Sequence, residues 1–230
     1  MPNWCVTKYT AMGSKEDIEA LAKTLNELPN AIENGFGRLW IGNLFARFGY
    51  CEGKILYGHI SCRGILYPDY ETGPCFCGPA DPDESTEKMK FEPCMDGTRL
   101  DFAATTAWRP SGDLNNLIEE KFPSVTLCWS ATDEFHNFHT AHNPLGLTWM
   151  PRFYFAGKSY SEDEADSLVE YMKERCTGLD IPKTVDGLAS KEFADRFKKW
   201  HEAWCDEVDD DDDEEWYERR CCWFEAYEAA

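Results

Sequence analysis

At 230 residues, with 43% hydrophobic and 14% aromatic residues, the chain is long and apolar enough to bury a core in one or two domains. A net charge of −20 opposes binding to the phosphates of nucleic acids and to anionic membranes, and it favours basic partners. No apolar run approaches the roughly 20 residues of a membrane-spanning helix, so no membrane association is expected.

The chain begins with a predicted strand and helix. Trp4–Met12 is the strand, and a Gly-Ser turn follows it. Ser14 and Asp17 have the spacing of a capping box, and apolar residues then recur at every third or fourth position up to Leu28. Pro29 is expected to end this helix.

The next segment predicts a β-hairpin and a long loop. Arg38–Tyr50 and Lys54–Tyr67 are rich in aromatic and β-branched residues and are interrupted by glycines, which favours strands joined by turns. Pro68–Pro93 holds too many turn residues for a regular element. We interpret it as the main part of a loop insertion at about residues 68–98.

A second strand-helix-strand unit follows. Arg99–Trp108 alternates apolar residues on one face, a helix starts near Asp113, and Pro123 ends it. Ser124–Ala131 alternates in the same way and predicts another strand. Two such units with an intervening strand form a split β-α-β arrangement, an antiparallel sheet with both helices on one face. The predicted class is therefore α+β, with a ferredoxin-like core.

Two stretches of this core carry a family resemblance. The first is Met1-Pro-Asn-Trp-Cys5 leading through a strand to Gly13, and the second is Thr106-Ala-Trp108 followed by a helix and Phe122-Pro123. Together they resemble the YubB-type ferredoxin-like domain proteins of plasmids and phages, over about residues 1–30 and 99–134. The resemblance implies a ferredoxin-like fold and an origin on a mobile element. It supplies no catalytic residues.

After residue 150 the pattern changes. Leu147–Ala156 predicts a strand, and Ser161-Glu-Asp-Glu164 caps an amphipathic helix. Ser190 begins a second amphipathic helix, which carries phenylalanines and tryptophans on one side. Trp216–Tyr227 has aromatic residues on more than one face and predicts a last helix.

Negative charge is concentrated in this C-terminal part. Residues 158–230 contain 23 acidic and 10 basic residues, whereas residues 1–157 contain 20 and 13. We therefore divide the chain into a core, 1–157, and a helical acidic extension, 158–230. Within the extension, Asp206–Glu215 is an acidic block interrupted only by Val208. Such a block attracts basic surfaces, including grooves built for nucleic acid, and the alternative is a solvated loop that aids solubility.

Histidines and cysteines offer one candidate metal site. His136, His139 and His142 have His-x-x-His spacing, which can place two imidazoles together, and Cys75 and Cys77 can supply thiolates. The alternative is that these are ordinary loop residues. The eleven cysteines are odd in number and lack the spacing of a disulfide-rich domain, and the first residues lack signal-peptide features. Both observations predict a reduced, cytoplasmic protein.

The sequence contains no recognisable catalytic motif. A phosphate-binding glycine loop, Gly-x-Ser-x-Gly and His-Glu-x-x-His are all missing. Cys5, Cys128 and Cys176 lie in strand or helix patterns and are interpreted as buried apolar residues. RNA-binding sheets need aromatic and basic residues on their central strands. The candidate strand has Phe102 and Trp108 but basic residues only at its ends, so direct nucleic-acid binding is not expected.

These observations favour a non-enzymatic, cytoplasmic, acidic binding protein of a phage or plasmid that needs no cofactor. We expect an anti-defence inhibitor that occludes the nucleic-acid groove of a basic host protein, such as a nuclease or CRISPR-type effector. The alternative is a zinc-stabilised protein or metal-dependent enzyme that uses the cysteine and histidine clusters. The predicted partner-binding residues are acidic or aromatic: Glu162, Asp163, Glu164, Asp206, Glu207, Asp209, Asp210, Asp211, Asp212, Asp213, Glu214, Glu215, Trp216 and Trp223.

Overall fold

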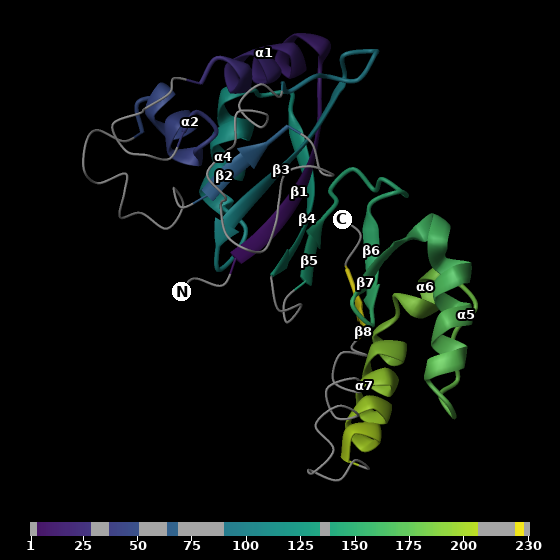
Figure 1. Cartoon of the computed structure of the whole chain (residues 1–230). Helices are drawn as coiled ribbons and strands as arrows, with labels where there is room; N and C mark the ends of the chain where they lie inside the picture. Colours follow the sequence, from purple (N-terminus) through teal and green to yellow (C-terminus); the bar gives the residue numbers. More distant parts are fainter. Residues whose placement is uncertain are drawn as a thin grey trace. The chain divides into compact units, whose positions relative to one another are not determined.

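The computed structural model describes residues 4–28, 37–50, 64–68, 90–133, 139–206 and 224–227. It divides the chain into two units, Met1–Pro144 and Leu145–Ala230 (Figure 1). Each unit combines antiparallel strands with helices, so the α+β class is confirmed. The division falls earlier than residue 157, because the strand just before that residue pairs with strands of the second unit.

The N-terminal unit is built on a five-stranded antiparallel sheet in the order β2-β3-β1-β4-β5. The central strand β1 pairs with β3 on one side and β4 on the other, and Tyr9 lies opposite Phe102 and Trp129. The strands predicted at β1, β3 and β4 are confirmed. The five strands are β1 (Trp4–Met12), β2 (Gly64–Tyr67), β3 (Arg99–Ala107), β4 (Thr126–Asp133) and β5 (His139–His142).

The two helices predicted in this unit are confirmed, and each begins with a serine cap. The Ser14 hydroxyl accepts a hydrogen bond from the Asp17 backbone N–H at 3.3 Å, and the Ser111 hydroxyl accepts one from Leu114 at 3.2 Å. These bonds satisfy N–H groups that the first turn of a helix leaves without a partner. The helices are α1 (Lys15–Asn26), α2 (Ile41–Arg47) and α4 (Gly112–Lys121).

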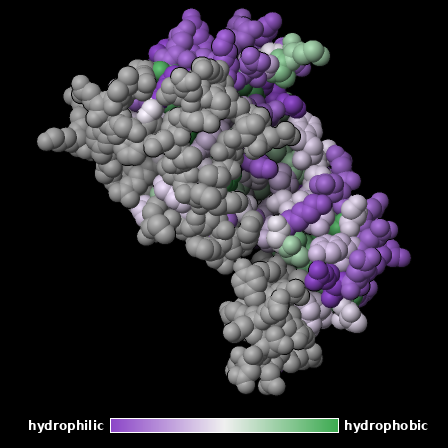
Figure 2. Space-filling model, in the orientation of Figure 1, coloured by the Kyte–Doolittle hydropathy of each residue, from purple (hydrophilic) through white to green (hydrophobic). Residues whose placement is uncertain are grey.

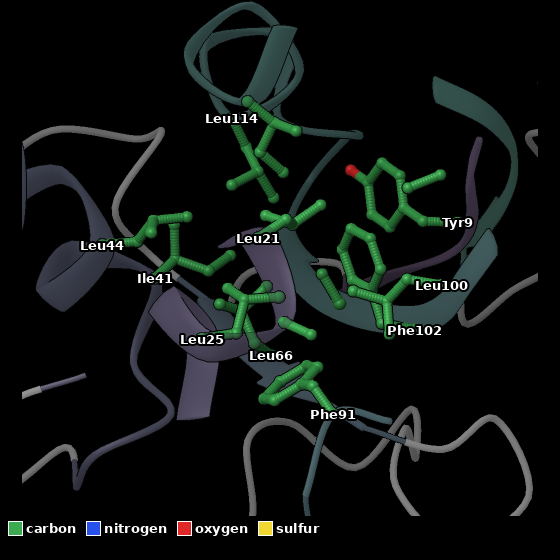
Figure 3. Close-up of a cluster of buried hydrophobic side chains, with 14 of the residues drawn as sticks. Tyr9, Leu21, Leu25, Ile41, Leu44, Leu66, Phe91, Leu100, Phe102 and Leu114 are labelled. Carbon is green, nitrogen blue, oxygen red and sulfur yellow. The ribbon is translucent and has the colours of Figure 1, made fainter. Parts of the chain in front are cut away.

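The core of this unit lies between one face of the sheet and the helices. Side chains of a strand alternate between its faces, and Tyr9 and Phe102 both point toward the helices, where their rings stack 4.7 Å apart. Leu21 of α1, Leu44 of α2 and Leu114 of α4 belong to the same buried cluster (Figure 3). Thus α1 and α4 cover the same face of the sheet.

The strand predicted at Arg38–Tyr50 is wrong, because this segment contains the helix α2. Ile41, Leu44 and Phe45 are buried at helical spacing in the core of the unit. Trp40, next to the helix, is also buried, and a Cβ atom at Gly42 would lie 2.3 Å from its ring. The glycine that favoured a turn therefore makes room for an aromatic ring.

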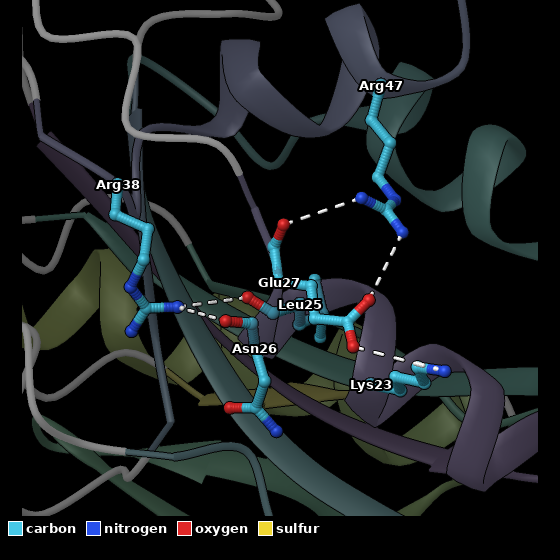
Figure 4. Close-up of polar contacts among 6 residues, drawn as sticks. All are labelled: Lys23, Leu25, Asn26, Glu27, Arg38 and Arg47. Atoms are coloured by element: carbon cyan, nitrogen blue, oxygen red, sulfur yellow. Dashed lines mark hydrogen bonds and ion pairs between the residues drawn. The ribbon is translucent and has the colours of Figure 1, made fainter.

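Two arginines, Arg38 before α2 and Arg47 at its last position, bind the end of α1 (Figure 4). Arg38 Nη1 donates to the carbonyl oxygens of Leu25 at 3.1 Å and Asn26 at 3.3 Å. Arg47 donates to the Glu27 carbonyl at 3.4 Å and lies 3.6 Å from its carboxylate. The last carbonyls of a helix lack helical partners and favour nearby positive charge, so α2 and α1 are held together at this point.

Much of the predicted hairpin and insertion lies outside the described residues. Of Lys54–Tyr67, the structure describes Gly64–Tyr67, which forms β2. Of the insertion at 68–98, it describes Pro68 and the part from Lys90 onward. There the Asn26 amide exchanges two hydrogen bonds of 2.9 Å with the backbone of Phe91, whose ring is buried in the core.

The C-terminal unit contains a three-stranded antiparallel sheet, β7-β6-β8, packed with helices around a second, largely aromatic core. The predicted strand at Leu147–Ala156 and both amphipathic helices are confirmed. The extension predicted as helical thus also contains a sheet, and the last predicted helix is wrong at its end, where β8 forms. The elements are β6 (Pro151–Phe155), β7 (Lys158–Ser161), α5 (Ala165–Arg175), α6 (Val185–Leu188), α7 (Lys191–Asp206) and β8 (Phe224–Ala226).

The surfaces of the helices match their amphipathic sequences. In the view of Figure 2, the coloured surface over α1 and α5 is mainly hydrophilic. Both helices bury apolar residues on one side, such as Leu21 and Leu168. Among the described residues, no helix is both long and apolar enough to cross a membrane.

Candidate functional site

The face of the large sheet that points away from the helices is not an aromatic platform. Phe102 is an aromatic residue of the kind that an RNA-binding sheet exposes for base stacking, but here it points into the core and stacks on Tyr9. On the opposite face, Arg99 Nε lies 3.0 Å from the Asp101 carboxylate, which also accepts a hydrogen bond from Thr10 at 2.7 Å. Base stacking needs several exposed aromatic rings on the central strands. On this face β3 carries none, and β1 carries only Trp4, which is half-buried at the start of the strand.

The cysteines predicted to be buried are buried. Cys5, Cys128 and Cys176 are each at most 2% exposed. Cys5 lies opposite Thr106 and Asp133 on the neighbouring strands, and burial raises the pKa of its thiol to about 12. Because the thiolate is the nucleophile, Cys5 is almost wholly unreactive at neutral pH.

The histidines of the predicted metal site do not converge. In β5, His139 lies opposite Thr132 and His142 lies opposite Trp129. Residues three apart in a strand point to opposite faces, so these two imidazoles cannot share one ion. His139 Nδ1 instead lies 2.8 Å from the Thr132 hydroxyl, and the His142 ring lies 5.8 Å from that of Trp129. Cys75, Cys77 and His136 lie outside the described residues.

Trp108, just after β3, has a positive φ angle, which the sequence did not predict. Its φ is 68°, a region that bulky residues rarely adopt, and its side chain is 45% exposed. The Arg109 N–H donates to the Ala107 carbonyl at 2.9 Å, which closes a three-residue turn around Trp108. The Thr106 hydroxyl donates to the Arg109 carbonyl at 2.7 Å and holds the turn.

Of the predicted partner-binding carboxylates, those before α5 have contacts within their own unit. Glu162 forms an ion pair with Arg152. Asp163 accepts a hydrogen bond from the Thr148 hydroxyl at 3.2 Å and remains exposed. Glu164 accepts one from the Ser161 backbone N–H at 2.9 Å and completes the predicted capping box. A partner would therefore have to compete with these contacts for each carboxylate. The competing contact of Asp163 is a single hydrogen bond of 3.2 Å.

The acidic block is joined at both ends to the same scaffold. Asp206 is the exposed last residue of α7, and the other block residues, with Trp216 and Trp223, lie outside the described residues. The chain returns at Phe224 in β8, whose ring lies 5.2 Å from Phe193 and 5.5 Å from Phe197 of α7. β8 also pairs with β6. Residues 207–223 are thus a connection between two packed elements and not a tail.

The charge of the C-terminal unit belongs to this connection. Residues 145–206 contain 12 acidic and 9 basic residues, a net charge of −3, whereas residues 207–223 contain 9 and 2, a net charge of −7. Residues 145–206 therefore have a small net charge, and most of the negative charge of this unit lies in residues 207–223. A connection of this charge is suited to electrostatic attraction of basic groups.

Comparisons with family models, with curated proteins and with solved structures found no match to the chain.

Proposed function

We propose that this is a non-enzymatic binding protein whose acidic block, Asp206–Glu215, engages a basic protein groove built for nucleic acid. The observation that carries the proposal is the tethering of residues 206–224, which start at the end of α7 and return through Phe224 to the same helix. A tether at both ends limits the conformations that ordering must remove when a partner binds, which a free tail does not.

The proposed partner is a host nuclease or CRISPR-type effector, and the role is anti-defence inhibition by a cytoplasmic phage or plasmid protein. Carboxylates would compete with phosphates for the arginines and lysines of the groove. Trp216 and Trp223 would add apolar contacts beside the charges. Of the predicted carboxylates before α5, Asp163 and Glu164 are exposed, and Asp163 has the longer hydrogen bond, 3.2 Å against 2.9 Å, so it is the more available for a further contact.

We further propose that the N-terminal unit is ferredoxin-like and related to the YubB-type proteins. The order β2-β3-β1-β4, with antiparallel neighbours and with α1 and α4 on one face, supports this fold. The resemblance of Met1–Cys5 and of the segment around Trp108 supports the relationship.

The test is to replace Asp209–Asp213 with asparagine and measure binding to basic partners captured from host lysate. Each exposed ion pair contributes about 0.2–1 kcal/mol, so the loss of five should weaken binding by about one to four orders of magnitude. Added salt should weaken the parent and affect the variant much less.

The matched control replaces Asp113, Asp166, Asp180, Asp186 and Asp195, which are distributed over the described helices and loops, with asparagine. It removes the same charge without touching the block. If both variants lose affinity equally, or if neither loses any, the acidic block is a solubilising loop and the proposal is wrong.

A further inference from the structure

Two large apolar side chains are exposed in the loop that leads into β6. Leu145 is 45% exposed and Trp149 is 51% exposed. The loop itself is folded, because the N–H of the buried Met150 donates to the Leu147 carbonyl at 3.1 Å. Tryptophan is enriched at the energetic centres of protein interfaces, whereas leucine is not, so Trp149 is the residue of interest in this loop.

Two hydrogen bonds fasten the loop to the acidic turn before α5. The Thr148 hydroxyl donates to the Asp163 carboxylate at 3.2 Å, and the Glu162 N–H donates to the Thr148 carbonyl at 3.1 Å. Trp149 directly follows Thr148, and consecutive Cα atoms are about 3.8 Å apart. The exposed indole therefore starts one residue away from the exposed Asp163 carboxylate, on the same part of the surface of this unit.

The carboxylates of this turn differ in the contacts that they already make. Glu162 forms an ion pair with Arg152. Glu164 accepts hydrogen bonds from both the backbone and the hydroxyl of Ser161. Asp163 accepts its bond from a neutral hydroxyl, and among the described residues no cation forms an ion pair with it. A positive group of a partner can therefore pair with Asp163 without displacing another cation.

An exposed indole beside such a carboxylate is suited to one kind of group. A guanidinium is planar, so it can stack on the face of an indole while its edge donates to a carboxylate. An ammonium also binds over aromatic rings, but it is a compact, strongly hydrated charge without a flat face. Of the two basic side chains, arginine is therefore the better match to this surface.

We propose that Trp149 and Asp163 form a docking surface for an arginine side chain of a basic protein. The indole supplies the stacking face, and the carboxylate supplies the complementary charge. This inference rests on the proposed function, because it names a group of the basic partner, but it places the contact outside the acidic block.

The probes are an oligoarginine peptide and an oligolysine peptide of equal length, and calorimetry measures the affinity of each for the full chain. Trp149→Ala should weaken binding of the arginine peptide about 2- to 30-fold, the range that cation–π contacts span. Binding of the lysine peptide should change by less than about 2-fold. Trp149→Leu should lose as much arginine affinity as Trp149→Ala, because leucine is apolar but has no ring face.

A double-mutant cycle tests whether both side chains hold the same group. Asp163→Asn removes the charge but keeps an oxygen that can accept from Thr148. Combined with Trp149→Ala, it should lose less than the product of the two single fold-changes, because the two side chains are coupled through one arginine. Asp166→Asn, at an exposed carboxylate nearby, is the matched control and should not couple to Trp149. Trp108→Ala, at the exposed tryptophan of the other unit, should leave both affinities unchanged.

The same variants in the Asp209–Asp213→Asn background separate this inference from the proposed function. Loss of affinity for both peptides on that block substitution tests the acidic block, and the effect of Trp149→Ala should persist in either background. The proposal fails if Trp149→Ala or Trp149→Leu binds the arginine peptide as tightly as the parent, if both peptides lose equally, or if Trp149 and Asp163 do not couple. It also fails if the parent sediments as a dimer that Trp149→Ala dissociates, which would assign the surface to a second copy of the chain.

Discussion

Single residues connect the two halves of the N-terminal unit at the turn between β1 and α1. Asp17 accepts a hydrogen bond from the Ser124 backbone N–H at 2.9 Å, and the Ser124 hydroxyl accepts one from the Ser14 N–H at 2.9 Å. Ser124 lies two residues before β4, so the start of one helix is joined to the segment that leads into a distant strand. The capping residues were predictable from the sequence, but this second partner was not.

The turn at Gly13 leaves no room for a side chain, so replacing this glycine should destabilise the protein. A Cβ atom there would lie 2.9 Å from the Ser124 carbonyl oxygen, which is backbone and cannot move aside cheaply. We expect Gly13→Ala to lower the free energy of unfolding by about 1–3 kcal/mol, in the range of overpacked sites. Gly112→Ala is the matched control, because a Cβ atom there meets nothing within 4 Å. It should be neutral or stabilising in urea denaturation, and equal losses in both variants would contradict the steric explanation.

Two carboxylates should make the N-terminal unit sensitive to acid. Hydrogen bonds from Ser124 lower the pKa of Asp17, and hydrogen bonds led by the Cys94 thiol, with Thr98, lower the pKa of Asp96 to about 2. A group with a lowered folded-state pKa stabilises the fold above its unfolded value, here 3.8, and that stability is lost as pH falls toward the folded value. Unfolding midpoints should therefore drop between about pH 4 and pH 2. Asp96→Asn should flatten this dependence, whereas unchanged pH dependence in the variant would exclude Asp96 as a cause.

At the scale of elements, the short strand β8 closes the connection that carries the acidic block. It pairs with β6, and the Tyr227 N–H donates to the Arg152 carbonyl at 2.8 Å just beyond it. Phe224 is its apolar anchor, in contact with Phe153 as well as with α7. Three residues of strand would not persist without such packing.

Phe224→Ala should therefore destabilise the C-terminal unit by about 3–5 kcal/mol, the usual cost of removing a buried phenylalanine. If the tether matters for function, partner affinity should also fall although every carboxylate remains. Phe48→Ala, at a partly buried ring of the other unit, is the control and should leave partner binding unchanged. Full affinity in a folded Phe224→Ala protein would show that the block works without its second anchor.

At the scale of the whole molecule, the two units have separate cores. One cluster is formed by β1, β2, β3, β4 and their helices, and the other by β6, β7, β8, α5 and α7. A unit with its own core can fold alone. We expect residues 1–144 and 145–230, expressed separately, each to unfold cooperatively in urea. A fragment without a cooperative transition would show that its core depends on the other unit.

Local patterns in the sequence determined the strands at β1, β3 and β4, the helices α1, α4, α5 and α7, and the position of the charge, because alternation, capping serines and charge runs act within a few residues. Local patterns did not predict α2 or β8.

The helix α2 depends on contacts with the end of α1 through Arg38 and Arg47, and β8 depends on Phe224 packing against α7. The spacing of His139 and His142 suggested a shared ion, and only their place in a strand separated them. Tertiary structure decided these points because each depends on partners far away in the chain, whose free energy of packing exceeds local preference.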